Sequence, residues 1–103
     1  MKQFLIIGLS LFSFSALADV PQPVVEFASA VGGYATISGR LDSTSRDPIG
    51  VTVEMGGLKY TTISDPNGKW SVVVKYRSTN YTVNSFNLMN SNERSEIHAE
   101  KLK

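Results

Sequence analysis

The chain has 103 residues, with ten lysines and arginines against nine acidic residues, and it contains no cysteine. A near-neutral balance with scattered basic residues argues against a nucleic-acid or anionic-membrane surface, because both need clustered positive charge. Without cysteine no disulfide can stabilise the fold, so hydrophobic packing must do so.

The first eighteen residues have the pattern of a cleaved secretory signal. Lys2 is followed by an apolar run over residues 4–14, and Ala-Leu-Ala at 16–18 is the small-x-small pattern that signal peptidase accepts. The run is shorter than the roughly 20 apolar residues of a membrane-spanning helix, and no second apolar segment follows. We therefore expect export to the periplasm or the extracellular space, as a mature chain that starts at Asp19 and does not insert into a membrane.

Residues 19–103 have the length of one domain, and their apolar side chains alternate with the period of two that is typical of half-buried strands. Pro21 and Pro23 favour an edge position for the first strand, since proline is tolerated only at a strand's start or at a sheet edge. Gly56-Gly57 predicts a two-residue hairpin, because glycine supplies the positive φ that such a turn needs. Strands are expected, in chain order, over residues 24–28, 34–41, 51–55, 58–63, 69–76, 80–88 and 95–102.

The alternation also predicts which side chains are buried. The face that carries the single tryptophan is expected in the core, where the indole N–H needs a hydrogen-bond partner. The members of this face are Trp70, Val72, Val74 and Tyr76. Val73 lies on the opposite face of the same strand.

The strand expected over 80–88 alternates less regularly. Its apolar phase begins on Tyr81 and Val83 but shifts to Phe86 and Leu88. A shift of one residue inside a strand predicts a bulge or a bend.

Residues 90–94 are expected to form the last turn, and the closing strand over 95–102 is expected to point Ile97 and Ala99 inward. The result is seven short strands with no helical segment between them. Such spacing predicts an all-β fold, an antiparallel immunoglobulin-like sandwich of about seven strands.

The sequence Asp65-Pro66-Asn67-Gly68 invites two interpretations, a metal-binding loop or a tight turn. Each residue suits a turn: Asp65 caps it, Pro66 fixes φ, and Gly68 takes the left-handed conformation. A calcium loop would need a Glu roughly twelve positions after its first Asp, and Tyr76 stands near that place instead. We therefore predict a turn.

A family resemblance rests on the run GVTVEMGGLKYTTISDPNGKWSVVV and the YTV sequence at 81–83. Across residues 49–84 the chain resembles the immunoglobulin-like domains that are repeated in large bacterial surface adhesins. It also looks like carboxypeptidase-regulatory or transthyretin-like modules, although Trp70 favours the adhesin type. The resemblance implies a β-sandwich with no catalytic residues to transfer. The single copy, in place of a tandem array, argues against a spacer role.

A search for reactive side chains yields no site. Glu96, His98 and Glu100 alternate in the last expected strand, but neighbours two apart on a strand stand roughly 7 Å apart. A single metal would not collect all three, and a charged, solvated edge strand explains the same residues. The chain has one histidine, and no G-x-S-x-G, P-loop or dinucleotide motif occurs. We therefore predict a protein that is not an enzyme, with no catalytic, cofactor-binding or metal-binding residues and no cofactor.

The sequence thus predicts an exported binding or structural module of the bacterial cell envelope, acting in protein–protein interaction or adhesion. Its partner would be an envelope or surface protein, or a surface glycan, bound through edge strands or through the polar loop over 42–50. Two alternatives remain open. A carbohydrate-binding module would need Tyr34, Tyr60, Tyr76 or Tyr81 on a flat exposed face. A small secreted hydrolase inhibitor would need the 42–50 loop to protrude rigidly.

Overall fold

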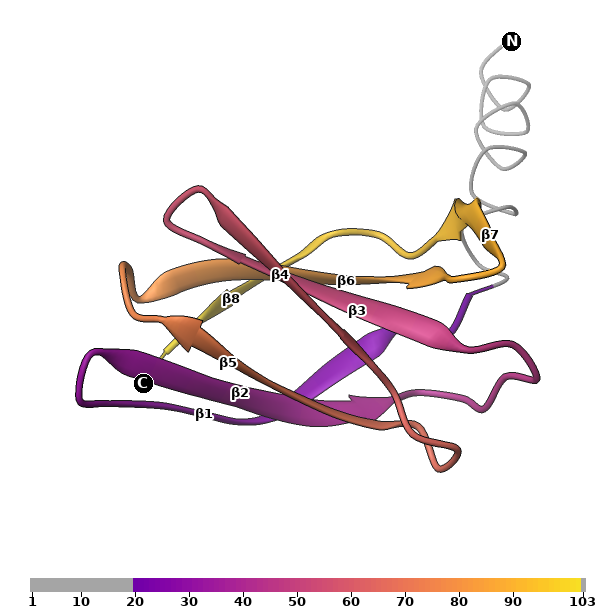
Figure 1. Ribbon diagram of the computed structural model, residues 1–103, viewed down its shortest axis with the longest axis horizontal. Helices are drawn as coiled ribbons and strands as arrows, with labels where there is room; N and C mark the ends of the chain where they lie inside the picture. The colour runs from indigo at the N-terminus through magenta and orange to yellow at the C-terminus, as the bar shows by residue number, and fades with distance from the viewer. Residues whose placement is uncertain (1–19, 103) are drawn as a thin grey trace, which may run out of the picture.

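The computed structural model describes residues 20–102, which form an all-β sandwich of two antiparallel sheets (Figure 1). The strands, in chain order, are β1 (Pro23–Val31), β2 (Tyr34–Leu41), β3 (Ile49–Met55), β4 (Leu58–Ile63), β5 (Lys69–Lys75), β6 (Asn80–Asn87), β7 (Asn90–Arg94) and β8 (His98–Lys101). The predicted all-β sandwich is confirmed. No helix in the described range is long and apolar enough to cross a membrane. The signal predicted over 1–18 lies outside the described residues.

One sheet has the strand order β1-β2-β5, and the other has the order β4-β3-β6 with β7 and β8 beside β6. β8 pairs with the first half of β6 and β7 pairs with its end, so these two short strands follow each other along one edge. This order is that of an immunoglobulin-like sandwich. The described residues hold eight strands, where the sequence predicted about seven, because residues 90–94 pair with β6 and do not form the expected turn.

Two Gly-Gly pairs close the β1–β2 and β3–β4 hairpins. Gly32 and Gly33 have φ values of 63° and 87°, and Gly56 and Gly57 have values of 60° and 85°. Positive φ at both central residues gives a turn whose twist matches that of the flanking strands. The hairpin predicted at Gly56-Gly57 is confirmed.

Apolar side chains from both sheets meet in one core between the layers. Trp70 is only 3% exposed, and its Nε1–H donates a hydrogen bond of 3.1 Å to the carbonyl oxygen of Arg40. The prediction that Trp70 is a core residue with a bonded N–H is confirmed. Tyr76, predicted on the same face, lies just beyond the end of β5 and is exposed. The largest fully buried apolar side chains are those of Ile37, Ile49, Val51, Val53, Met55, Val74 and Val83.

A bulge in β1 changes which of its side chains face outward. Val25 pairs with Gly39, and Phe27 pairs with Ser38, so Glu26 is an extra residue without a partner on β2. The alternation slips by one place at Glu26. Phe27 therefore lies on the outer face of the sheet, where 54% of its surface is exposed.

The shift of apolar phase expected inside the strand over 80–88 does not occur, although the pairing of β6 with β7 is irregular between Phe86 and Asn87. β6 alternates without a break, and its buried positions are Tyr81, Val83, Ser85 and Asn87. The two polar residues can occupy inward positions because their polar groups have partners there. Ser85 Oγ donates to the carbonyl oxygen of Pro21, and Asn87 Nδ2 donates to a carboxylate oxygen of Asp47 at 2.9 Å.

The prediction that Ile97 and Ala99 point inward is also wrong. In the β6–β8 pair His98 stands opposite the inward-facing Val83, so His98 takes the inner position and Ala99 the outer one. Ile97 is 69% exposed. Because β8 is an edge strand, a polar residue can occupy its inner side and still find a polar partner. His98 Nε2 lies 2.9 Å from Gln22 Oε1.

Candidate functional site

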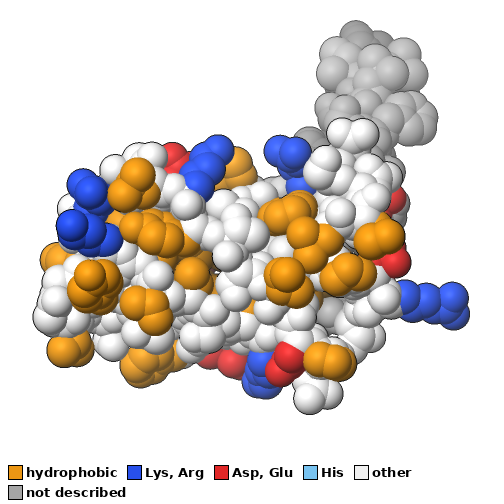
Figure 2. All heavy atoms as spheres, in the orientation of Figure 1, with side chains coloured by type: hydrophobic (Ala, Val, Ile, Leu, Met, Phe, Trp, Pro, Cys, Tyr) orange, Lys and Arg blue, Asp and Glu red, His pale blue; other side chains and the backbone are white. Residues whose placement is uncertain are grey.

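The outer face of the β1-β2-β5 sheet carries four large exposed hydrophobic side chains. Phe27, Val31, Tyr34 and Val73, which we call the apolar patch, are 54, 79, 56 and 58% exposed respectively. Figure 2 shows hydrophobic side chains at the end of the molecule where the β1–β2 hairpin lies, and others elsewhere on the face in view. A group of exposed apolar side chains on one face is typical of an interaction surface, whereas single exposed ones are ordinary.

Strand pairing brings the apolar patch together from distant parts of the chain. Val31 pairs with Tyr34 across the β1–β2 hairpin. Thr36, one row further along β2, pairs with Val73 of β5, and Phe27 lies in the row after that. Successive rows on one sheet face stand roughly 7 Å apart, so side chains of adjacent rows are neighbours. The patch therefore spans all three strands.

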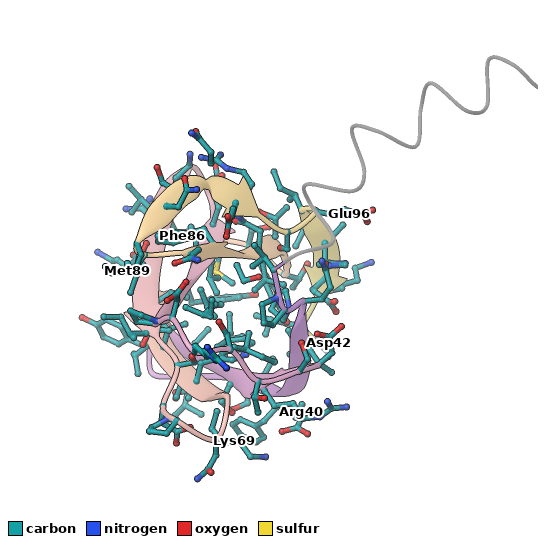
Figure 3. All side chains as sticks on the ribbon, turned by 90° about the vertical axis from the view of Figure 1, so that its right-hand side faces the viewer. Arg40, Asp42, Lys69, Phe86, Met89 and Glu96 are labelled. Atoms are coloured by element: carbon teal, nitrogen blue, oxygen red, sulfur yellow. The ribbon has the colours of Figure 1, made fainter. Side chains whose placement is uncertain are left out.

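Charged side chains border the apolar patch at both ends. At one end Arg40 Nε donates to Glu26 Oε2 at 3.1 Å, and Lys69 Nζ lies 3.6 Å from Glu26 Oε1. Figure 3 shows Arg40 and Lys69 on the same side of the molecule. At the other end Lys75 stands beside Tyr34 in the strand register. Exposed ion pairs contribute little to stability. Their relevance is that three basic groups and one acidic group stand at the two ends of the patch.

The outer face of the other sheet is recessed and polar. Two adjoining hollows of about 280 and 440 Å³ lie on it, and Glu54 and Thr82 line both. We call the combined depression the polar trough. Its half-buried floor consists of Thr52, Glu54, Thr82, Asn84 and Phe86, and its exposed rim includes Lys59, Thr61, Ser91, Arg94 and Ile97.

A glycine allows Phe86 to lie on the floor of the polar trough. Phe86 pairs with Gly50 across β3 and β6. A Cβ atom on Gly50 would lie 2.5 Å from Cζ of the Phe86 ring, closer than real Cβ contacts come. The ring therefore covers the β3 backbone in space that the side chain of another residue would fill.

The loop over 42–50 and the Asp65–Gly68 turn together line a hollow of about 310 Å³. In the turn, Asp65 Oδ1 accepts hydrogen bonds from the backbone N–H groups of Asn67 and Lys69, both at 2.9 Å. Gly68 has a φ of 84°. The turn predicted from the sequence is confirmed, and Asp65 caps it as expected.

The four tyrosines that a carbohydrate-binding module would need lie apart. Tyr34 is the one on an outer sheet face, and Tyr76 is exposed beyond the end of β5. Tyr60 is half-buried, and Tyr81 is 4% exposed. Burial, with a smaller contribution from the Glu100 carboxylate, raises the pKa of Tyr81 above its usual value.

Glu96, His98 and Glu100 do not form a common site. His98 bonds with Gln22, and Figure 3 shows Glu96 at the outside of the molecule. Within residues 20–102 no three or more histidine, cysteine or acidic side chains are grouped in a way that could hold a metal ion.

No protein-family model matches the chain, and no curated protein matches it.

The sequence does not predict the apolar patch as a unit. Alternation places Val73 opposite the core face, and Val31 adjoins a glycine turn, where exposure is expected. Phe27 is different, because regular alternation would put it on the same inward face as Val25. Only the bulge at Glu26 turns it outward, and no residue pattern in this segment marks that bulge.

Proposed function

We propose that the protein is an exported, non-catalytic binding module of the bacterial cell envelope, and that it binds another protein through the apolar patch. The observation that carries the proposal is the exposure of four large apolar side chains on one sheet face. The export signal predicted from the sequence and the resemblance to adhesin domains support an envelope location.

The composition of the apolar patch suits a protein partner. Aromatic side chains are enriched in protein interfaces because each supplies a large contact area with few rotatable bonds. Around the aromatic and aliphatic groups stand short hydroxyl side chains, which lose little rotamer entropy when a partner covers them. These short residues on the same outer face are Ser29, Thr36, Ser38 and Ser71.

The charges around the apolar patch favour a different protein over a second copy of the chain. Glu26 partly offsets Arg40 and Lys69 at one end, and Lys75 adds a positive charge at the other. In a symmetric face-to-face dimer each positive border would meet another positive border, which is unfavourable. A partner with an apolar centre and an acidic border would fit.

Charge insertion into the apolar patch provides the test. The double variant Val31→Lys/Val73→Lys places two ammonium groups in the patch at positions that are 79 and 58% exposed, so the fold should be retained. The tagged protein would be recovered from the envelope fraction after chemical crosslinking. We expect the wild-type protein to give one discrete crosslinked complex that the double variant lacks.

A matched control adds the same two charges elsewhere. Thr79→Lys/Asn92→Lys changes exposed positions outside the β1-β2-β5 sheet. The control should form the crosslinked complex as the wild type does. Equal loss of the complex in both variants, or retention in both, would contradict the assignment of the patch.

A further inference from the structure

We propose that the polar trough on the β4-β3-β6 face is a second binding site, and that its ligand is a neutral oligosaccharide. The site is independent of the apolar patch, because it lies on the outer face of the opposite sheet. Three properties of the trough identify the ligand class: one aromatic ring, a floor of hydroxyl and amide groups, and no cluster of like charge.

The aromatic ring is that of Phe86. The far end of the ring lies over Gly50, and the residue is half-buried in the lining of the trough. A ring fixed in this way offers its remaining surface to the ligand without further loss of side-chain freedom. The C–H groups of a sugar ring carry a slight positive charge and are attracted to the negative face of an aromatic ring.

The hydrogen-bonding groups come from three adjacent strands. Thr52 pairs with Asn84 on β6 and with Thr61 on β4, and the two threonine hydroxyl oxygens lie 3.2 Å apart. Thr82 continues the row of polar groups towards Glu54, its partner on β3. Hydroxyl and amide groups both donate and accept hydrogen bonds, as the hydroxyl groups of a sugar do. A rigid sheet holds them in fixed positions.

The charges in the trough favour a neutral ligand. On the outer face the two hollows carry one acidic side chain, Glu54, and two basic ones, Lys59 and Arg94. Glu100 pairs with the inward-facing Tyr81, so its side chain is on the inner side of the sheet. Lys59 stands directly opposite Glu54 in the β3–β4 register. Glu54 offsets Lys59, and the Arg94 guanidinium donates to the Ser91 carbonyl oxygen, so the trough lacks the clustered positive charge that an anionic polymer needs. A neutral oligosaccharide can use all three groups as hydrogen-bond partners.

A titration followed by nuclear magnetic resonance tests the site directly. The exported protein, labelled with ¹⁵N, would be titrated with neutral hexasaccharides built from glucose, mannose, xylose or N-acetylglucosamine, and with hexagalacturonate as an acidic comparison. We expect at least one neutral hexasaccharide to shift backbone amide signals of β3, β4 and β6, and hexagalacturonate to shift them less. No shift with any neutral hexasaccharide, or shifts confined to β1, β2 and β5, would overturn the proposal.

Variants of the trough separate binding from folding. Phe86→Ala removes the ring and should abolish detectable binding, but its loss could also disturb the sheet. Asn84→Leu keeps the outer face filled while removing the amide, and it should weaken binding roughly three- to tenfold, the value of one net hydrogen bond. The control Thr79→Val removes an exposed hydroxyl that does not line the trough, and it should bind as the wild type does. Wild-type affinity in folded Asn84→Leu would contradict the proposed site.

Discussion

Replacing Trp70 by alanine should destabilise the protein by about 3–5 kcal/mol, the usual cost of deleting a buried aromatic side chain. The indole is 3% exposed, and its Cζ2 atom would lie 3.1 Å from a Cβ built on Gly39. Because the indole packs against a glycine backbone, no neighbouring side chain at that position can move in to fill the cavity. The carbonyl oxygen of Arg40 would also lose its hydrogen bond from the indole, which adds about 1 kcal/mol.

This loss is large against the total stability of the domain. At about 0.05–0.15 kcal/mol per residue, a domain of this size has a free energy of unfolding of about 4–12 kcal/mol. The variant should therefore lose between a third and all of it. Urea denaturation followed by far-ultraviolet circular dichroism measures the change without depending on the tryptophan that is removed.

The matched control is Tyr34→Ala, which removes an aromatic side chain that is 56% exposed. It should change the free energy of unfolding by no more than about 1 kcal/mol. If Trp70→Ala cost no more than Tyr34→Ala, the assignment of Trp70 to the core and of Tyr34 to the surface would be refuted.

Three further predictions follow from the turn, the trough and the buried tyrosine. Gly68→Val should cost about 1 kcal/mol or more in thermal unfolding, because a β-branched residue resists a φ of 84°, and added calcium should not change the melting temperature. Gly50→Ala should lower the free energy of unfolding by about 1–3 kcal/mol, because the added methyl group displaces Phe86. The same substitution should cost less in a Phe86→Leu background. If the two substitutions had additive effects in this double-mutant cycle, the contact between residues 50 and 86 would be refuted. Burial and the Glu100 carboxylate raise the pKa of Tyr81 above 10.0 in the folded state. Its neutral form therefore contributes stability below pH 10, and this stability is lost as the pH rises through the folded-state pKa. Above pH 10 the melting temperature of Tyr81→Phe should therefore fall less than that of the wild type. Parallel profiles of melting temperature against pH for the two proteins would contradict this.

Much of the fold follows from local patterns in the sequence. The Gly-Gly pair at 56–57 and the Asp65–Gly68 turn form as predicted, because positive φ and side-chain capping are local properties. The strand around Trp70 is also predicted correctly, since its apolar and polar residues alternate strictly. Local chemistry is enough for these elements.

The residues whose burial was predicted wrongly depend on contacts that are distant in sequence. Ser85 occupies a core position because it bonds with Pro21, sixty-four residues earlier, and this partner cannot be recognised from alternation. Phe86 looks like a core residue and lies outside, because Gly50 on the neighbouring strand leaves room for its ring. Phe27 depends on the bulge at Glu26, which only the pairing with β2 reveals. The two candidate surfaces therefore rest on pairing between strands, which periodicity alone does not specify.

The central claim, that the apolar patch binds another protein, is tested most directly by photo-crosslinking in the cell. The photoreactive residue p-benzoylphenylalanine would replace Tyr34 within the patch or, as a control, Asn92, which lies exposed on β7. We predict that irradiation gives one discrete adduct at Tyr34, heavier than the chain by the mass of a different protein, and that Val73→Lys abolishes it. An adduct at Asn92 with none at Tyr34, or an adduct of twice the mass of the chain, would contradict this account.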